Sequence, residues 1–365
     1  MASGTALRIY AGPRARAHLQ REGLRPQDIA VVPGAAGGPK GLVLGPLDRF
    51  LFGEWLPRSS QPVHLVGASI GAWRMATACL DDAVPAFERL ERDYIAQDYE
   101  LEAGRKTPTA KHVSERFAAN LADFYGDRIA QVLAHPRYRL HVVTSRGRHL
   151  LGREHRVGTP LGYLGAYLSN TVHRRALGLW LERVVFSTGP AEEAFALPFD
   201  SADFTTRQVR LTETNFQPAL QASCSIPFVL QAIHDIPGAP RGAYWDGGIT
   251  DYHLHLDYAA RHPDGLVLYP HFQKAVVPGW LDKAWRWRHG ATPFLDTTIV
   301  LAPDPEWIRK LPNGKLPDRT DFTRYGTDLL SRMQAWHAAA DASRQLADEF
   351  AQWLERPDPA RVEAL

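Results

Sequence analysis

The segment Val63-His-Leu-Val-Gly67-Ala-Ser69-Ile-Gly71 decides the fold class of this 365-residue chain. Its apolar start leads into glycine and serine, and a helix-like stretch follows over residues 72–80. The same order occurs earlier, where the apolar run 29–32 precedes a glycine-rich loop over 34–41 and an apolar-periodic segment over 42–52. Strand, glycine turn and helix, repeated in this way, are typical of a parallel sheet covered by helices. The sequence therefore predicts an α/β fold.

Short apolar runs farther along the chain predict additional strands. Residues 82–135 lack such runs and are rich in charge and helical spacing, which predicts a helical insertion on the sheet, interpreted as a cap. Apolar side chains over 325–354 have the spacing of one long amphipathic helix that packs on the body. No Pro/Ser-rich linker divides the chain, so we expect one domain over 6–320 and a C-terminal helical extension over 321–365. The additional strands are expected at Tyr138–Thr144, Arg183–Ser187, Gln208–Thr212, Gly265–Tyr269 and Thr297–Leu301.

The composition excludes several classes of protein. Hydrophobic residues make up 45% of the chain, which is enough for a sizeable core. The formal charge of +2 gives little basis for attraction to nucleic acid, so no nucleic-acid partner is expected. The two cysteines, Cys79 and Cys224, are too few for a disulfide framework and indicate reduced thiols. There is no apolar run of signal-peptide or membrane-spanning length, so we expect a soluble, cytoplasmic protein.

Ser69 has the surroundings of a catalytic nucleophile. A nucleophile on a sharp strand-to-helix turn needs small neighbours, and Gly67 and Gly71 stand two residues to either side of the serine. The start of the following helix also favours developing negative charge. The alternative is a glycine-tolerant turn in which Ser69 only caps the helix.

A second glycine-rich turn, Ala36-Gly37-Gly38-Pro39-Lys40-Gly41, follows the first apolar run. Successive backbone N–H groups in such a loop can point at an oxyanion. Phosphate binding is excluded, because a Walker loop needs Gly before the lysine and Ser or Thr after it, and no dinucleotide fingerprint fits residues 34–41. A plain tight turn is the alternative.

A third pattern is Tyr244-Trp245-Asp246-Gly247-Gly248. It places a carboxylate at the end of an apolar segment, where two glycines let another backbone approach. An aspartate held against Ser69 takes its proton directly, without an intervening histidine. An ordinary Asp-Gly turn is the alternative.

In this order the three patterns resemble those of the patatin-like phospholipases. That family has G-G-G-x-(K/R)-G, then G-x-S-x-G, then D-G-(G/A), and it uses a Ser–Asp dyad. The segment Ala222-Ser-Cys-Ser-Ile-Pro227 is also similar to the stretch that precedes the family's dyad aspartate. The resemblance covers about residues 28–255 and is made of short motifs.

The resemblance implies a role for each matching position. Ser69 is the expected nucleophile and Asp246 the expected proton acceptor. The other implied positions support these two residues: the oxyanion hole of Gly37, Gly38, Pro39, Lys40, Gly41 and Ile70, the elbow glycines Gly67 and Gly71, and the dyad turn of Gly247 and Gly248.

The resemblance also implies a fold and an activity. The fold is a three-layer sandwich with a central, mostly parallel sheet between helices, and the activity is hydrolysis of lipid carboxylic esters through an acyl-enzyme, of the phospholipase A or lysophospholipase type. The dyad needs no metal or other cofactor. Ala36 stands where the family has the first glycine of the oxyanion loop; an alanine still presents its N–H unless the position needs a positive φ.

Two other functions remain open from the sequence. A Ser–His–Asp hydrolase would draw its histidine from the fifteen in the chain, with His253, His255, His271 and His289 as candidates. A non-catalytic scaffold of the same fold would bind lipid without cleaving it.

Two further clusters have an ordinary and a functional interpretation. His253-Leu-His255-Leu-Asp257 would place two imidazoles and a carboxylate on one face of an extended strand, where they can hold a metal, although a polar edge strand is the commoner case. Trp280, Trp285 and Trp287 alternate with basic residues, which suits simple packing or transient contact with a membrane surface.

Overall fold

A computed structural model describes residues 5–99, 108–189, 196–201 and 203–365 of the chain. One sheet runs through the described residues in the order β11-β1-β10-β9-β2-β3-β4-β5-β6, with β8 also paired to β4 and β7 to β8. Most neighbouring strands are parallel; the antiparallel pairs are β1 with β10, β4 with β5, β4 with β8 and β7 with β8. The strands are β1 (Leu7–Ala11), β2 (Ile29–Gly34), β3 (Val63–Ala68), β4 (Tyr138–Gly147), β5 (Leu181–Ser187), β6 (Thr206–Arg210), β7 (Ile233–His234), β8 (Ala243–Asp246), β9 (Leu266–Pro270), β10 (Thr298–Pro303) and β11 (Val362–Ala364).

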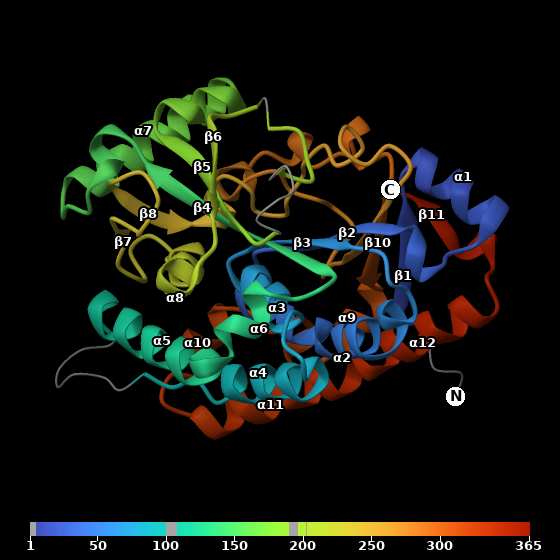
Figure 1. Ribbon diagram of the computed structural model, residues 1–365. Helices are drawn as coiled ribbons and strands as arrows, with labels where there is room; N and C mark the ends of the chain where they lie inside the picture. The colour runs from blue at the N-terminus through green and yellow to red at the C-terminus, as the bar shows by residue number, and fades with distance from the viewer. Residues whose placement is uncertain (1–4, 100–107, 190–195, 202) are drawn as a thin grey trace.

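Helices cover both faces of this sheet, so the expected α/β class is confirmed. Figure 1 shows most of them gathered below the sheet, with α1 and α7 on the opposite side. The helices are α1 (Pro13–Glu22), α2 (Gly45–Phe50), α3 (Ile70–Thr77), α4 (Ala83–Ile95), α5 (Ala110–Tyr125), α6 (Ile129–Leu133), α7 (Gly158–Val172), α8 (Glu213–Ser223), α9 (Pro305–Lys310), α10 (Thr320–Tyr325), α11 (Leu329–Ala342) and α12 (Arg344–Glu355).

The central strands form where the sequence has short apolar runs. In β2 and β3 every residue but one is buried, as expected for parallel strands covered on both faces. The strands predicted over 138–144, 183–187, 265–269 and 297–301 correspond to β4, β5, β9 and β10. The strand predicted at 208–212 lies two residues earlier, because Thr212 begins α8: its backbone N–H donates to Asn215 Oδ1 in a capping box.

The described part of the insertion predicted over 82–135 is helical. It contains α4, α5 and α6, which join the helical layer below the sheet in Figure 1 instead of forming a separate cap over the strand ends. Helix α4 packs against α2, α3 and α11, and α5 packs against α8.

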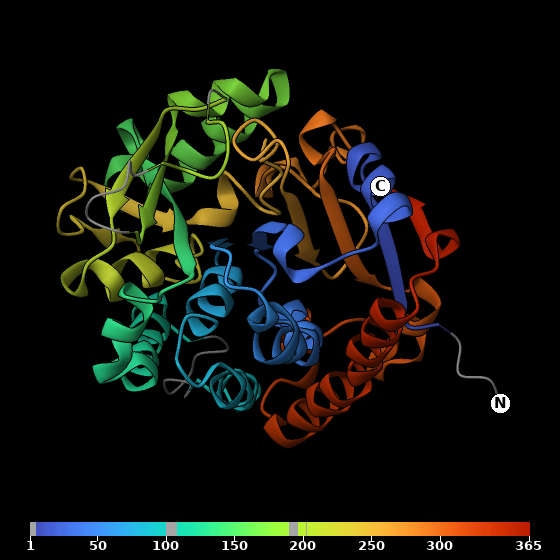
Figure 2. The same cartoon turned by 45° about the vertical axis from the view of Figure 1, so that its right-hand side comes forward.

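The prediction of a single long helix over 325–354 is wrong, because this segment forms more than one helix. Gly326 ends α10 with φ +53°, a value that glycine adopts easily, and α11 and α12 are separate helices that meet at Ser343. The C-terminal residues also provide the edge strand β11, which pairs with β1; Figure 2 shows this red end of the chain beside the blue first strand. Among the described residues no helix is long and apolar enough to span a membrane.

Candidate active site

Strands β3 and β8 bring the first and third sequence patterns together. Strand β3 runs parallel to β4 and ends with Ala68 opposite Val143. Strand β8 runs in the opposite direction along the same edge of β4 and ends with Asp246 opposite Thr144. The two strands therefore approach each other end to end, and the residue that follows β3 meets the last residue of β8.

Ser69 occupies a strained turn between β3 and α3. Its φ of 55° and ψ of −130° lie outside the usual regions for a residue with a side chain. The two flanking glycines are required by close backbone approach: a Cβ at Gly71 would lie 1.8 Å from Gly34 O, and one at Gly67 would lie 2.4 Å from Ala72 Cα. The backbone N–H of Ser69 donates to Ser223 Oγ at 3.0 Å, which helps to hold the turn.

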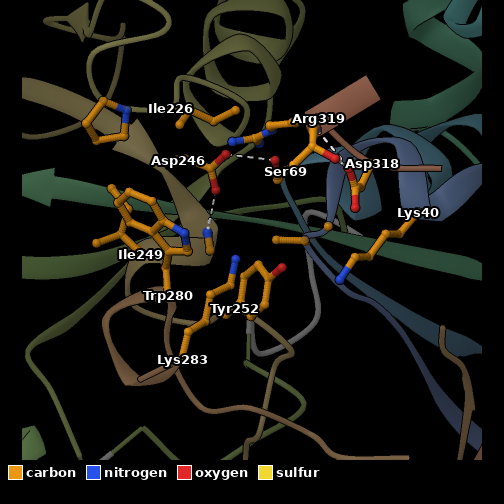
Figure 3. Close-up of a pocket in the computed structure, with 15 residues that line it drawn as sticks. Lys40, Ser69, Ile226, Asp246, Ile249, Tyr252, Trp280, Lys283, Asp318 and Arg319 are labelled. Atoms are coloured by element: carbon orange, nitrogen blue, oxygen red, sulfur yellow. Dashed lines mark hydrogen bonds between the residues drawn. The ribbon is translucent and has the colours of Figure 1, made fainter. Parts of the chain in front are cut away.

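The Ser69 side chain contacts the carboxylate directly. Ser69 Oγ donates a 2.7 Å hydrogen bond to Asp246 Oδ2, and the backbone N–H of Gly248 donates to Asp246 Oδ1, also at 2.7 Å. Both side chains are buried at the end of a cavity (Figure 3). Burial raises the pKa of Asp246 to about 6, while the Ser69 hydrogen bond and the nearby Arg319 limit this rise. A carboxylate with this pKa is ionised at neutral pH and is a stronger base than a solvent-exposed aspartate.

Three backbone N–H groups of the predicted oxyanion hole, those of Gly37, Gly38 and Ile70, have no hydrogen-bond acceptor in the described part of the chain. Of these residues only Gly37 lines the dyad cavity; Gly38 and Ile70 line a neighbouring pocket, and Ile70 directly follows Ser69. A Cβ at Gly37 would lie 2.5 Å from the ring of Phe272. Gly38 has φ +58°, which favours glycine.

Ala36 differs from these donors because its N–H is already bonded. It donates to Tyr252 O at 2.9 Å, and Ala36 is not among the positive-φ residues of the described chain. The methyl group at this position therefore neither removes an available donor nor strains the loop.

The remaining loop and turn residues lie in three different places. Lys40 lines the cavity, with Nζ 5.1 Å from the centre of the Phe272 ring. Pro39 and Gly41 are buried in the short helix Gly38–Leu44 and do not line the cavity, so the structure does not bring them to the dyad. Gly247 packs against β4, where a Cβ would lie 2.1 Å from Val143 O.

The cavity has a volume of about 200 Å³. It is also lined by residues that the motifs did not indicate. Ile226, Pro227, Ile249 and Trp280 provide an apolar wall. Lys283, Asp318, Arg319 and Thr320 come from the last hundred residues, in which the sequence indicated no active-site residue. Their positions were not predictable because they depend on how the segment after β9 folds back over the strand ends.

None of the four candidate histidines bonds to Ser69 or lines the cavity. His253 and His255 interact through Nδ1 with the carbonyls of Ala275 and Val276. His271 contacts Gln273 O and His289 contacts Asp282 O, in each case through a ring nitrogen. These contacts give all four a structural partner away from the dyad.

The predicted extended arrangement of residues 253–257 is wrong. Leu254 has φ +49°, which turns the chain and removes the alternation that would place both imidazoles on one face. Within the described ranges no group of three or more His, Cys, Asp or Glu side chains is placed to hold a metal ion.

The three tryptophans of the basic cluster have different surroundings. Trp280 is half-buried in the cavity wall, and Trp285 is half-buried with its ring stacked on Tyr167, 5.9 Å between centres. Trp287 is 70% exposed. Only Trp287 of the three is thus open to a partner surface.

No protein-family model matches this chain, and a search of curated proteins finds no match. The functional assignment therefore depends on the geometry of the site and on the short motifs.

Proposed function

We propose that this protein is a patatin-like serine hydrolase that cleaves carboxylic esters of lipids, of the phospholipase A or lysophospholipase type. The observation that supports this most directly is the 2.7 Å hydrogen bond from Ser69 Oγ to Asp246 Oδ2 at a cavity. A nucleophile and base in direct contact fit a Ser–Asp dyad better than a Ser–His–Asp triad, because Ser69 has no histidine partner among the described residues. The catalytic domain would cover 6–320, supported by the extension 321–365.

The first half of the reaction forms an acyl-enzyme. Asp246 accepts the Ser69 proton as Oγ attacks the ester carbonyl carbon. The carbonyl oxygen becomes an oxyanion, which the N–H groups of Gly37, Gly38 and Ile70 stabilise. Collapse of this intermediate breaks the bond to the alcohol, and the departing alcohol takes the proton from Asp246.

The second half restores the enzyme. Water attacks the acyl carbon while Asp246 accepts one of its protons, and the acid then leaves as Ser69 Oγ is reprotonated. The same carboxylate serves both halves, so no metal or cofactor enters the scheme.

The test is covalent labelling combined with turnover. A fluorophosphonate probe should label the wild type at Ser69, and the purified protein should hydrolyse at least one class in a panel of lipid and short-chain esters. Ser69→Ala and Asp246→Asn should each lower turnover by at least about 10⁴-fold, as expected for loss of a member of such a unit. Circular dichroism should show that both variants are folded.

The alternative functions give different results. A wild type that neither labels nor turns over any ester would be a non-catalytic lipid-binding scaffold. Loss of turnover on changing one of the four histidines alone to alanine would favour the triad. Full activity in either dyad variant would refute the dyad.

A further inference from the structure

Three cations line the cavity without an ion-pair partner among the described residues: Lys40, Lys283 and Arg319. Lys283 is exposed at the rim, but its ammonium group points into the cavity in Figure 3 and lies 3.9 Å from the centre of the Tyr252 ring. In the same view the guanidinium group of Arg319 lies next to the dyad. The cations thus line the same cavity as the dyad and come from three separate segments.

Two of the three buried arginines in the described part of the chain make ion pairs, and the third, Arg332, bonds to the carbonyl of Gln97. Arg74 bonds to Asp48 at 2.7 Å, and the buried Arg183 bonds to both Asp251 and Asp203. This is the expected behaviour, because a charge removed from water is costly unless it is paired. The cavity cations are more accessible: Lys40 is half-buried, and Lys283 and Arg319 are exposed at the rim, where water or a bound anion can face them.

The carboxylates at the cavity do not balance these charges. Asp318 lines the wall but bonds to Lys315 at 2.8 Å and to Thr320. Asp246 provides one negative charge when ionised. Burial lowers the pKa of Lys40, and burial together with Lys40 and Arg319 lowers the pKa of Lys283 to about 8, as expected when like charges share a site.

We propose that Lys40, Lys283 and Arg319 form a subsite for an anionic group, a carboxylate or a phosphate, carried by the ester substrate. This proposal rests on the proposed hydrolase function and specifies its substrate class: the preferred ester bears a negative charge close to the scissile bond. The small cavity favours such local recognition, since pockets that enclose whole drug-sized ligands measure about 300–1,000 Å³.

The experiment compares matched esters that differ only in charge. In the acyl arm, mono-4-nitrophenyl succinate is compared with 4-nitrophenyl butyrate; in the alcohol arm, butyryl glycerol 3-phosphate is compared with monobutyrylglycerol. We expect kcat/KM to be about tenfold or more higher for the anionic member in one arm. A rate ratio of about this size corresponds to one favourable charge-assisted hydrogen bond. Lys283→Gln and Arg319→Gln should each remove most of this ratio, whereas Lys310→Gln, an exposed lysine on α9, should keep it.

A binding measurement tests the subsite without turnover. Calorimetric titration of Ser69→Ala with succinate and with glycerol 3-phosphate should detect binding of one of them, and the same titration of Ser69→Ala/Arg319→Gln should be weaker. Two results would overturn the subsite while leaving the proposed hydrolase function intact. One is a kcat/KM that is equal for the anionic and the neutral ester in both arms. The other is a preference for the anionic ester that persists in both Lys283→Gln and Arg319→Gln. Anion binding by a protein that hydrolyses no ester would support the subsite and refute the proposed function.

A second inference comes from the outer face of α7. Its large apolar side chains at 157, 161, 164, 168 and 172 recur at helical spacing and are between 53% and 85% exposed. The opposite face, with Tyr163 and Ala166, is buried. Residues 158–172 include no charged side chain. A solvent-facing apolar stripe of this kind marks an interaction surface. The stripe consists of Val157, Leu161, Leu164, Leu168 and Val172.

Helix α7 lies beside the mouth of the cavity, which its opposite face contacts. Tyr163 contacts the ring of Phe228, 5.8 Å between centres. Phe228 is 61% exposed and directly follows Pro227, which lines the cavity wall. Trp285 stacks on Tyr167 of the same helix and contacts the exposed Trp287, so this tryptophan adjoins the stripe.

Basic residues accompany the stripe. Residues 148–175 include five arginines and a single acidic residue, Glu154. Arg153 and Arg156 before α7 and Arg175 after it are exposed and make no ion pair with a described residue. Apolar side chains bordered by arginines complement a lipid surface with anionic headgroups. A symmetric dimer through this face would instead place the arginine borders of two copies together.

The geometry points to the α7 stripe as the surface that docks this protein on an anionic lipid interface. Sedimentation should retain the wild type on vesicles with equal amounts of phosphatidylcholine and phosphatidylglycerol, and less on phosphatidylcholine alone. Leu164→Glu/Leu168→Glu should abolish retention without changing hydrolysis of a water-soluble ester. Leu330→Glu, at a 71% exposed leucine on α11, is the matched control and should bind like the wild type.

Three outcomes would overturn this docking surface. One is absence of binding to both vesicle types, and another is unchanged binding by the double variant. The third is a wild-type dimer, measured by light scattering, that the double variant converts to monomer, because a second copy would then be the occupant. Each outcome is independent of whether Ser69 hydrolyses an ester.

Discussion

The hydroxyl group of Ser223 lies beneath Ser69 and accepts its backbone N–H at 3.0 Å, while donating to Val143 O at 2.7 Å. Ser223 is fully buried and is the last residue of α8. It therefore joins the strained turn to strand β4, the strand with which both β3 and β8 pair. No feature of Ser223 in the sequence distinguishes it from its neighbour Ser225.

Ser223→Ala should lower kcat with little change in KM. The Ser69 N–H would lose its acceptor, which costs about 1–3 kcal/mol for a buried group, and the turn would hold Oγ less firmly. The matched control is Ser225→Ala, whose hydroxyl donates only to Gln221 O at 3.0 Å. Steady-state kinetics and thermal melting of the pair separate positioning from stability: equal losses of kcat in both variants would contradict a positioning role.

The pH dependence of hydrolysis should follow Asp246. Only the ionised carboxylate accepts the Ser69 proton, and its pKa is raised to about 6. For a neutral ester, kcat/KM should therefore fall as pH decreases through about 6 and should level off above it. A profile with its midpoint near pH 4, close to the pKa of an exposed aspartate, would show that burial does not raise the pKa of Asp246.

Asp246→Asn should make the protein more stable at neutral pH even as it removes activity. A raised pKa in the folded state means that the folded protein binds more protons than the unfolded chain between about pH 4 and 6, so stability falls as pH rises through this range. A difference of about two in pKa corresponds to roughly 3 kcal/mol. Thermal melting should show a gain for the variant at pH 7.5 that disappears below about pH 4; an equal gain at both values would have another cause.

Gly37→Ala should impair the oxyanion hole. The added methyl group would press on the Phe272 ring and displace the loop that presents the Gly37 and Gly38 donors. Loss of one such donor lowers kcat by about 10²–10³ in comparable sites. Ala36→Gly is the control, because the Ala36 N–H bonds to Tyr252 O and not to substrate; a large rate increase in that variant would mean that Ala36 limits the loop.

Selectivity for anionic esters should decline at alkaline pH. The ammonium group of Lys283, with its pKa lowered to about 8, is charged below that value and neutral above it. The ratio of kcat/KM for an anionic ester to that for its neutral match should therefore fall between pH 7 and 9.5, whereas the neutral ester alone should show no such fall. A constant ratio would exclude Lys283 from the subsite.

Most of the strands that are predictable from sequence are buried on both faces; the edge strand β6 is the exception. Segments such as Val63–Val66 consist of apolar residues because helices cover both sides, and their composition alone indicates a strand. Short strands do not have this property. Ala243–Asp246 is a strand only because β4 extends beyond the end of β3 and leaves an edge to pair with.

The same reasoning applies to the site. Ser69 and Asp246 could be predicted because each needs glycines at fixed positions, which leave a motif. Lys283 and Arg319 contribute only charge, which is compatible with any surface position, and their approach to the dyad depends on long-range folding. The outward face of α7 was unpredictable for a related reason: apolar spacing indicates a helical face but not whether that face is covered.

The end-to-end meeting of β3 and β8 has a consequence for biosynthesis. Ser69, the proposed nucleophile, is made early, but Asp246, its proposed base, is 177 residues farther along the chain. A nascent chain therefore exposes Ser69 without a proton acceptor until β8 has emerged and paired with β4, and contacts this distant in sequence form late in folding. Under the proposed mechanism, hydrolytic competence is therefore withheld from the growing polypeptide, and labelling of Ser69 would report that β8 has paired with β4.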